Sequence, residues 1–166
     1  YEKIHIGPGS DAMANNPWAH EMGDPISKAT WGNYLAVPRV MAEADEYKFV
    51  QGDVVKVTFA NGKSVELPVL IQPGQAPGTV AIAMGYGRDL ESMPVAKGLG
   101  ANAFLLTSAA GNTVSYSNTV KRIEKTGPTS EIAQLQTHHT IMDRLVVQEN
   151  TLAKYKENPK EVTEYI

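Results

Sequence analysis

Apolar and polar side chains alternate most regularly between residues 55 and 69. Apolar residues take every second position in 55–59 and again in 65–69, and Asn61-Gly62 separates the two runs. A period of two places one face of a strand in the core and the other in solvent. Asn-Gly between two such runs is the strongest short-range signal of a β-hairpin, because a type I′ turn needs positive φ at both central residues. The pattern therefore predicts a hairpin with a type I′ turn.

Other short apolar runs continue this pattern on both sides of the hairpin. They lie at residues 3–6, 79–84, 103–107 and 113–123, and Gly, Pro and Asn separate them. Runs of this length between turn residues are typical of strands. Together with the hairpin they give six or seven strands within about 120 residues. This predicts a mainly β fold that closes into a compact barrel.

Helical signals are fewer. Pro38 fits the first position of a short helix over 38–45, and Thr151 can cap a second over 151–158, which Pro159 ends. Residues 7–31 have no sustained periodicity, so we expect a long ordered loop or lid there. From residue 127 the composition becomes polar and charged. We therefore expect one domain over 1–126 and a long polar tail or linker over 127–166, leading to a further domain.

The composition narrows the class of protein. The chain has 166 residues, of which 42% are hydrophobic and 20% charged, and its formal net charge is -3. These values are typical of a globular protein with one core, and they lack the positive charge of a nucleic-acid-binding surface. No apolar run approaches the roughly 18–20 residues that span a bilayer, so we expect no direct membrane insertion. With no cysteine, these residues cannot form disulfides, iron–sulfur clusters or thiol nucleophiles.

The turn Gly85-x-Gly87-Arg88 is the first candidate for ligand chemistry. Glycine lets backbone N–H groups approach an anion, and arginine binds oxyanions with two hydrogen bonds. Three later residues can line the same surface: Gly98, Gly100 and Asn102. The alternative is a purely structural turn. We favour that alternative on these residues alone, because the third glycine and the following helix of a dinucleotide fingerprint are missing.

The segment around Trp18 is the second candidate. An exposed indole beside nearby polar residues can stack on a planar ligand or a partner; these residues are Asn15, Asn16, His20, Glu21, Asp24 and Lys28. The alternative, which we favour on these residues alone, is that Trp18 and Trp31 pack the loop onto the barrel. The histidines lack metal-ligand spacing, and no serine stands in a Gly-x-Ser-x-Gly elbow. These residues therefore indicate a binding or scaffolding domain rather than a catalytic one.

Several motifs stand in a characteristic order along residues 3–117: Asn33-Tyr34-Leu35-Ala36-Val37, Gly52-Asp53-Val54-Val55, Asn61-Gly62, Leu67-Pro68-Val69, Pro77-Gly78-Thr79-Val80, Gly85-Tyr86-Gly87-Arg88 and Gly100-Ala101-Asn102-Ala103. In this order they resemble the molybdopterin-dinucleotide-binding domain, the C-terminal module of the dimethyl-sulfoxide-reductase family. The resemblance implies a double-psi β-barrel, the aspartate-decarboxylase-like fold. In the molybdenum and tungsten enzymes of that family, loops after the strands hold the pterin cofactor. The matching positions here are Asn33, Gly85, Tyr86, Gly87, Arg88 and Asn102.

Three further segments resemble one branch of this family, the large iron–sulfur subunit of alternative complex III. They are residues 14–18, residues 24–31 and the tail with His138-His139, Arg144, Val146-Val147, Thr151-Leu152 and Tyr155. That branch implies a respiratory complex that oxidises quinol on the periplasmic side of the bacterial inner membrane. There the molybdopterin-type module is retained without its cofactor, and the iron–sulfur clusters lie in a neighbouring domain.

The resemblance therefore implies a scaffold and subunit interface with no catalysis and no cofactor of its own. Its partners are other domains of the same chain and other subunits of the membrane-bound complex. The segment 6–10 (Ile-Gly-Pro-Gly-Ser), in place of the family's usual Thr-Gly-Arg-type start, favours the cofactor-free form. The alternative is a genuine molybdopterin-guanine-dinucleotide-binding domain of a molybdenum or tungsten oxidoreductase. A bare double-psi barrel that binds protein is a third class.

Overall fold

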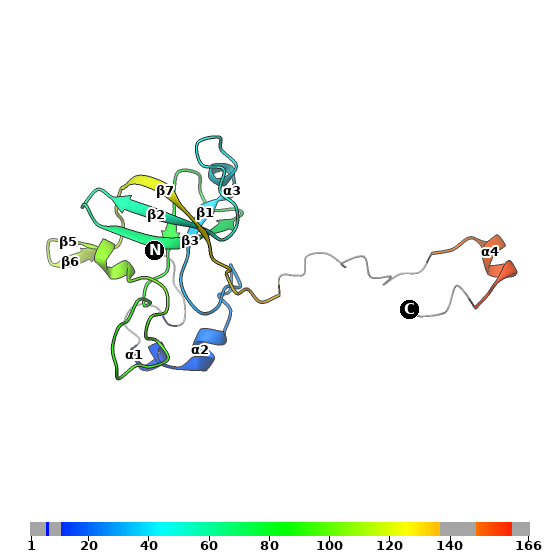
Figure 1. Cartoon of the computed structure of the whole chain (residues 1–166), viewed down its shortest axis with the longest axis horizontal. Helices are drawn as coiled ribbons and strands as arrows, with labels where there is room; N and C mark the ends of the chain where they lie inside the picture. Colours follow the sequence, from blue (N-terminus) through cyan, green and yellow to red (C-terminus); the bar gives the residue numbers. More distant parts are fainter. Residues whose placement is uncertain (1–5, 7–10, 137–148, 161–166) are drawn as a thin grey trace. The chain divides into compact units, whose positions relative to one another are not determined.

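The computed structural model describes residues 6, 11–136 and 149–160. The chain divides into two compact units, Tyr1–Leu135 and Gln136–Ile166. The first unit contains a mixed five-stranded sheet in the order β4-β1-β3-β2-β7 and a separate two-stranded sheet of β5 and β6 (Figure 1). Helices are few and short. The mainly β prediction is confirmed, but neither sheet closes into a barrel.

The elements follow one another along the chain without a long helix. In chain order they are α1 (Asp11–Ala14), α2 (Pro17–Glu21), β1 (Leu35–Pro38), α3 (Arg39–Ala42), β2 (Asp53–Phe59), β3 (Ser64–Gln72), β4 (Ala81–Ile82), the 3₁₀ helix η1 (Ala103–Leu106), β5 (Ser108–Ala110), β6 (Thr113–Ser115), β7 (Val120–Thr129) and α4 (Leu152–Glu157).

The predicted hairpin is present as β2 and β3, which pair antiparallel from Val54 with Pro68 to Thr58 with Ser64. Its turn differs from the predicted type I′. Gly62 has a φ of 78°, whereas Asn61 keeps a negative φ, and the Gly62 amide donates to the Phe59 carbonyl at 3.0 Å. This is a type I turn followed by a glycine in the left-handed region, the usual form of a longer hairpin loop.

Strand β3 changes partner at its centre. Its first half, up to Pro68, pairs with β2, and its second half, Val69–Gln72, pairs in parallel with β1. Proline has no N–H for the ladder, so it is tolerated where pairing on one side ends. The two halves of the sheet are therefore offset along β3.

Strand β1 has apolar or small residues on both faces, and all four of its residues are buried. Leu35 and Val37 belong to the main core, while Ala36 packs with Tyr34 and Leu70 on the opposite face. A strand covered on both sides carries no alternation, which explains why periodicity does not reveal it. The main core consists of Leu35, Val37, Ala42, Phe49, Val55, Val57, Phe59, Leu67, Val69, Ile82, Met84, Ala103 and Leu106.

Three strand predictions differ from the structure. The run 79–84 forms only the two-residue β4. The prediction of a strand at 103–107 is wrong. A 3₁₀ helix lies there, and Asn102 caps it by accepting from the Phe104 amide at 3.0 Å. The run 113–123 divides into β6 and the start of β7. The strand predicted at 3–6 lies outside the described residues except for Ile6.

The helix predictions fare better. Helix α3 covers part of the predicted 38–45 and begins after Pro38, which still belongs to β1. Helix α4 lies within the predicted 151–158, and Thr151 Oγ1 accepts from the Lys154 amide at 3.4 Å, as expected of a cap. The long loop predicted over 7–31 contains two short helices, α1 and α2, among its described residues.

The first compact unit extends past residue 126. Strand β7 continues to Thr129, which pairs with Asp53, and the Ser130 amide donates to the Gly52 carbonyl at 2.8 Å. Farther on, the Thr30 amide donates to the Ala133 carbonyl at 2.8 Å. The beginning of the polar segment thus forms a strand and hydrogen bonds with the loop around Thr30. Of the second unit, α4 is the one element within the described residues.

A polar cluster fixes β7 to the start of β2. Asp53 accepts hydrogen bonds from the Val50 amide and from Lys125 Nζ, both at 2.8 Å, and Lys125 also donates to the Lys48 carbonyl at 2.7 Å. The Lys125 ammonium lies 5.7 Å from the centre of the Phe49 ring. Burial raises the pKa of Asp53, but the hydrogen bonds from Lys125 and Val50 and the charge of Lys125 outweigh it and lower the pKa overall.

We expect Asp53→Asn to destabilise the fold by about 1–2 kcal/mol at pH 7, because it weakens a charge-assisted hydrogen bond. A carboxylate with a lowered pKa stabilises the fold above its unfolded pKa, near 3.9, and this contribution is lost as the pH falls through the lower folded value. Urea unfolding at several pH values should show the difference between variant and parent shrinking below about pH 4. A difference that stays constant down to pH 2 would contradict the ion pair's role.

Candidate functional site

A pocket of about 390 Å³ lies where the chain turns after β4. Gly85, Tyr86, Gly87, Arg88 and Asn102 line it, so five of the six positions predicted for the cofactor come together in one place. Asp89, Leu90 and Phe104 complete the lining. Sequence reasoning missed these three, although each follows a predicted residue within two positions. The volume lies at the low end of the range of roughly 300–1,000 Å³ that is usual for small-molecule sites.

Asn33, the sixth predicted position, is not part of the lining and is used internally. Its side chain is 4% exposed. The Nδ2 group donates to the carbonyls of Ala83 and Ala101, both at 2.8 Å, and Oδ1 accepts from the Ala101 amide at 2.8 Å. A carboxamide has two N–H donors, and both are engaged here. The structure thus makes Asn33 a clamp between two backbone segments.

Two glycines allow the backbone around this clamp to come close. A Cβ on Gly87, which has a φ of 70°, would lie 2.2 Å from the Asn102 nitrogen, and a Cβ on Gly100 would lie 2.4 Å from Asn33 Oδ1. The Gly87 amide also donates to the Leu99 carbonyl at 2.8 Å. The predicted glycines therefore serve a close approach between segments 85–88 and 98–102.

Arg88 and Asn102 also make bonds within the turn. Arg88 Nε donates to the Gly85 carbonyl at 3.0 Å, and the Arg88 carbonyl accepts from the Gly98 amide at 3.0 Å. Asn102 Oδ1 caps η1, as described above.

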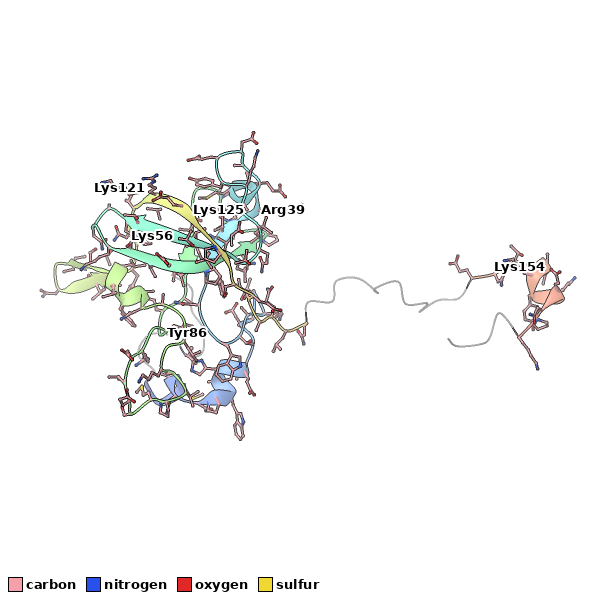
Figure 2. The ribbon with its side chains drawn as sticks, in the orientation of Figure 1. Arg39, Lys56, Tyr86, Lys121, Lys125 and Lys154 are labelled. Atoms are coloured by element: carbon pink, nitrogen blue, oxygen red, sulfur yellow. The ribbon has the colours of Figure 1, made fainter. Side chains whose placement is uncertain are left out.

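Tyr86 links the pocket to the segment around Trp18. It packs with Ala19 and Ala83, and Figure 2 shows it between the sheet and the α1–α2 region. Its ring meets the His20 ring edge-on at 6.0 Å between centroids, and His20 stacks on Trp31 at 5.3 Å. The expected packing of Trp31 onto the domain is therefore present, but the same expectation is wrong for Trp18, which is 79% exposed.

His20 is 2% exposed, and its Nε2 lies 2.7 Å from the Ala14 carbonyl. A carbonyl oxygen only accepts, so Nε2 donates this hydrogen bond. Nδ1 has no hydrogen-bond partner in the protein, and it is the one such buried side-chain nitrogen or oxygen among the described residues.

The loop between α2 and β1 is held by its own polar groups. Asp24 Oδ2 accepts from the amides of Ile26 and Ser27 at 3.1 and 2.9 Å, and the Tyr34 hydroxyl donates to Ser27 Oγ at 2.6 Å.

Asn15, which precedes α2, bonds a distant part of the backbone. Its Oδ1 accepts from the amides of Val95 and Ala96, at 2.9 and 3.3 Å. Asn15 and Asp24, which the sequence suggests as ligand contacts, thus stabilise the backbone.

No group of three or more His, Asp or Glu side chains within residues 6, 11–136 and 149–160 is placed to hold a metal ion. In the same described part of the chain, no helix has both the length and the apolar character needed to cross a membrane. His138 and His139 lie outside the described residues.

Comparisons with known proteins do not assign a family. No family model matches the chain, and no curated protein matches it. The class that the structure defines is a mainly β domain with a mixed sheet and a small glycine-lined pocket.

We expect Asn33→Asp to destabilise the fold by about 2–4 kcal/mol at pH 7, because the carbonyls of Ala83 and Ala101 lose their donors and face a buried carboxylate. Asn102→Asp is the matched control: its Oδ1 only accepts, so aspartate keeps the cap and should cost less than about 0.5 kcal/mol. Chemical unfolding of both variants measures the difference. Equal losses would show that Asn33 is not the clamp.

Gly87→Ala should destabilise the domain by about 3–5 kcal/mol, because the new methyl group meets backbone atoms that cannot rotate away. Gly98→Ala is the control, since Gly98 has a similar φ of 74° and a Cβ there would meet no atom within 4 Å. It carries only the cost of the left-handed backbone, about 1–2 kcal/mol. Unfolding free energies from urea titration would contradict the close approach if the two variants were equally stable.

Proposed function

We propose that this chain is a molybdopterin-binding-like domain without catalysis of its own, built as a double-psi β-barrel. It acts as scaffold and subunit interface in a quinol-oxidising, iron–sulfur respiratory complex on the periplasmic side of the bacterial inner membrane. The mixed sheet supports this fold assignment, because it combines one parallel pair, β1 with β3, with antiparallel neighbours.

The observation that carries the scaffold role is the use of the cofactor-type residues to hold one another. Both N–H donors of the Asn33 side chain bond backbone carbonyls. Gly87 packs against the backbone of Asn102, and the Asn102 side chain caps η1. In a binding site such polar groups are expected to point at the ligand. Loops whose polar groups form hydrogen bonds with one another in this way keep their shape without a cofactor.

Exposed apolar side chains support the interface role. Trp18 is 79%, Ile26 69% and Met22 54% exposed, all within a few residues of one another along the chain. The same segment is anchored by the buried His20 and Asp24. A rigid segment that presents large apolar groups is a common feature of protein–protein contacts. Because the chain has no cysteine, iron–sulfur clusters of the parent complex would be bound by a neighbouring domain.

The second candidate function is a genuine molybdopterin-guanine-dinucleotide-binding domain. The gathering of Gly85, Tyr86, Gly87, Arg88 and Asn102 around one pocket favours it. In that case the backbone amides and Arg88 would bind the phosphates of the cofactor. The chemistry of these groups fits an anion, but Asn33 has no donor left for it.

Metal and pterin analysis of the intact protein, purified from its native source, separates the two candidates. We expect molybdenum, tungsten and oxidised pterin well below one equivalent, with no change in Arg88→Ala. Stoichiometric metal and pterin in the parent protein, lost in Arg88→Ala at unchanged thermal stability, would overturn the scaffold proposal and establish the cofactor domain.

A further inference from the structure

A second and larger pocket, of about 760 Å³, shares no lining residue with the pocket around Gly87. It is lined from one side by Gly78, Thr79, Val80, Ile82 and Met84, on and beside β4. From the other side it is lined by residues 116–123, which include the start of β7. Since β4 and β7 stand at opposite ends of the strand order, the curved sheet brings its two edges to the same pocket. Among the described residues, each of these strands pairs on one side only.

The floor of this groove is apolar. Phe59, Ile82, Met84 and Leu106 are buried core residues that also line it. Lys121 and Arg122 lie on the rim, on β7, and both are exposed. Figure 2 shows Lys121 at the beginning of β7. Arg122 pairs with Glu124 at 2.8 Å, whereas Lys121 occupies a bulge opposite Thr58 and Phe59.

The size of the groove fits one extended strand. Strands lie about 4.8 Å apart in a sheet, sheets pack about 10 Å apart, and each residue advances about 3.3 Å, which gives about 160 Å³ per residue. A pocket of 760 Å³ thus corresponds to about five residues. Strand β7 supplies a strand edge beside the groove, and the two-residue β4 supplies a short edge opposite it, to which an added strand can pair.

We infer that this groove binds an extended segment of a partner polypeptide as an additional β-strand between β4 and β7. The segment has apolar side chains at alternate positions, directed to the Phe59–Ile82 floor, and an acidic residue near Lys121. A small apolar ligand would use the floor but leave both strand edges unpaired. The inference gives the proposed scaffold role a partner class and rests on that role, while its residues are separate from the cofactor-type cluster.

The test uses ¹⁵N-labelled chain and the peptide acetyl-Glu-Val-Thr-Val-Thr-Val-Glu-amide. We expect amide shifts confined to β4, β7 and the lining between them, with millimolar or tighter binding. The same peptide with N-methyl groups on its valines cannot donate along one edge and should bind at least about tenfold more weakly. Equal binding of the N-methylated peptide, or no shift of β4 and β7 amides at several millimolar peptide, would overturn strand addition.

A second test asks whether Lys121 selects for an acidic peptide. Lys121→Glu should weaken binding of the acidic peptide about three- to tenfold and strengthen binding of its lysine-ended counterpart. Lys63→Glu, an equal charge change in the exposed hairpin turn outside the groove, should alter neither. Concentration-dependent shifts of the same amides without peptide would instead assign the groove to a second copy of this chain. Metal and pterin content is independent of this outcome, so the two proposals can fail separately.

Discussion

The carboxamide of Asn33 joins segments that are remote in the sequence, and the arrangement around it depends on those bonds. It stands just before β1, holds the carbonyl of Ala83 just after β4, and holds both the carbonyl and the amide of Ala101 before η1. Each contact supplies a hydrogen bond to a backbone group that would otherwise have no partner. Gly100 permits the approach, because any side chain there would overlap Asn33 Oδ1.

This clamp also accounts for the end of β4 at Ile82. Pairing with β1 stops at Ile82, and the next carbonyl, that of Ala83, is taken by Asn33. The chain then turns through Gly85 and Gly87 towards segment 98–102. The two-residue β4 thus pairs with only Leu35 and Ala36 of the four residues of β1.

The sequence predicts the fold best where one interaction dominates. Alternation in β2 and β3 and the cap at Thr151 depend on local chemistry, and these elements are found as expected. Strand β1 cannot be recognised by alternation, because both its faces are buried. The run 103–107 fails as a strand because its apolar residues suit a helix equally well and Asn102 decides between them as a cap. The pocket's members were predictable from their glycines, whereas the internal use of Asn33 depends on contacts some 50 and 68 positions away.

A domain that needs a ligand for its shape leaves polar groups in the empty site unpaired, so that binding stabilises the fold. The cofactor-type turns here are bonded to one another instead. The buried polar atom without a protein partner, among the described residues, is His20 Nδ1, in the segment that also presents Trp18 to solvent. A buried polar atom without a hydrogen-bond partner costs stability and needs a reason. The polar groups of the turn around Gly87 are thus bonded within the protein. The unpaired polar atom lies in the segment around Trp18, for which we propose a protein contact.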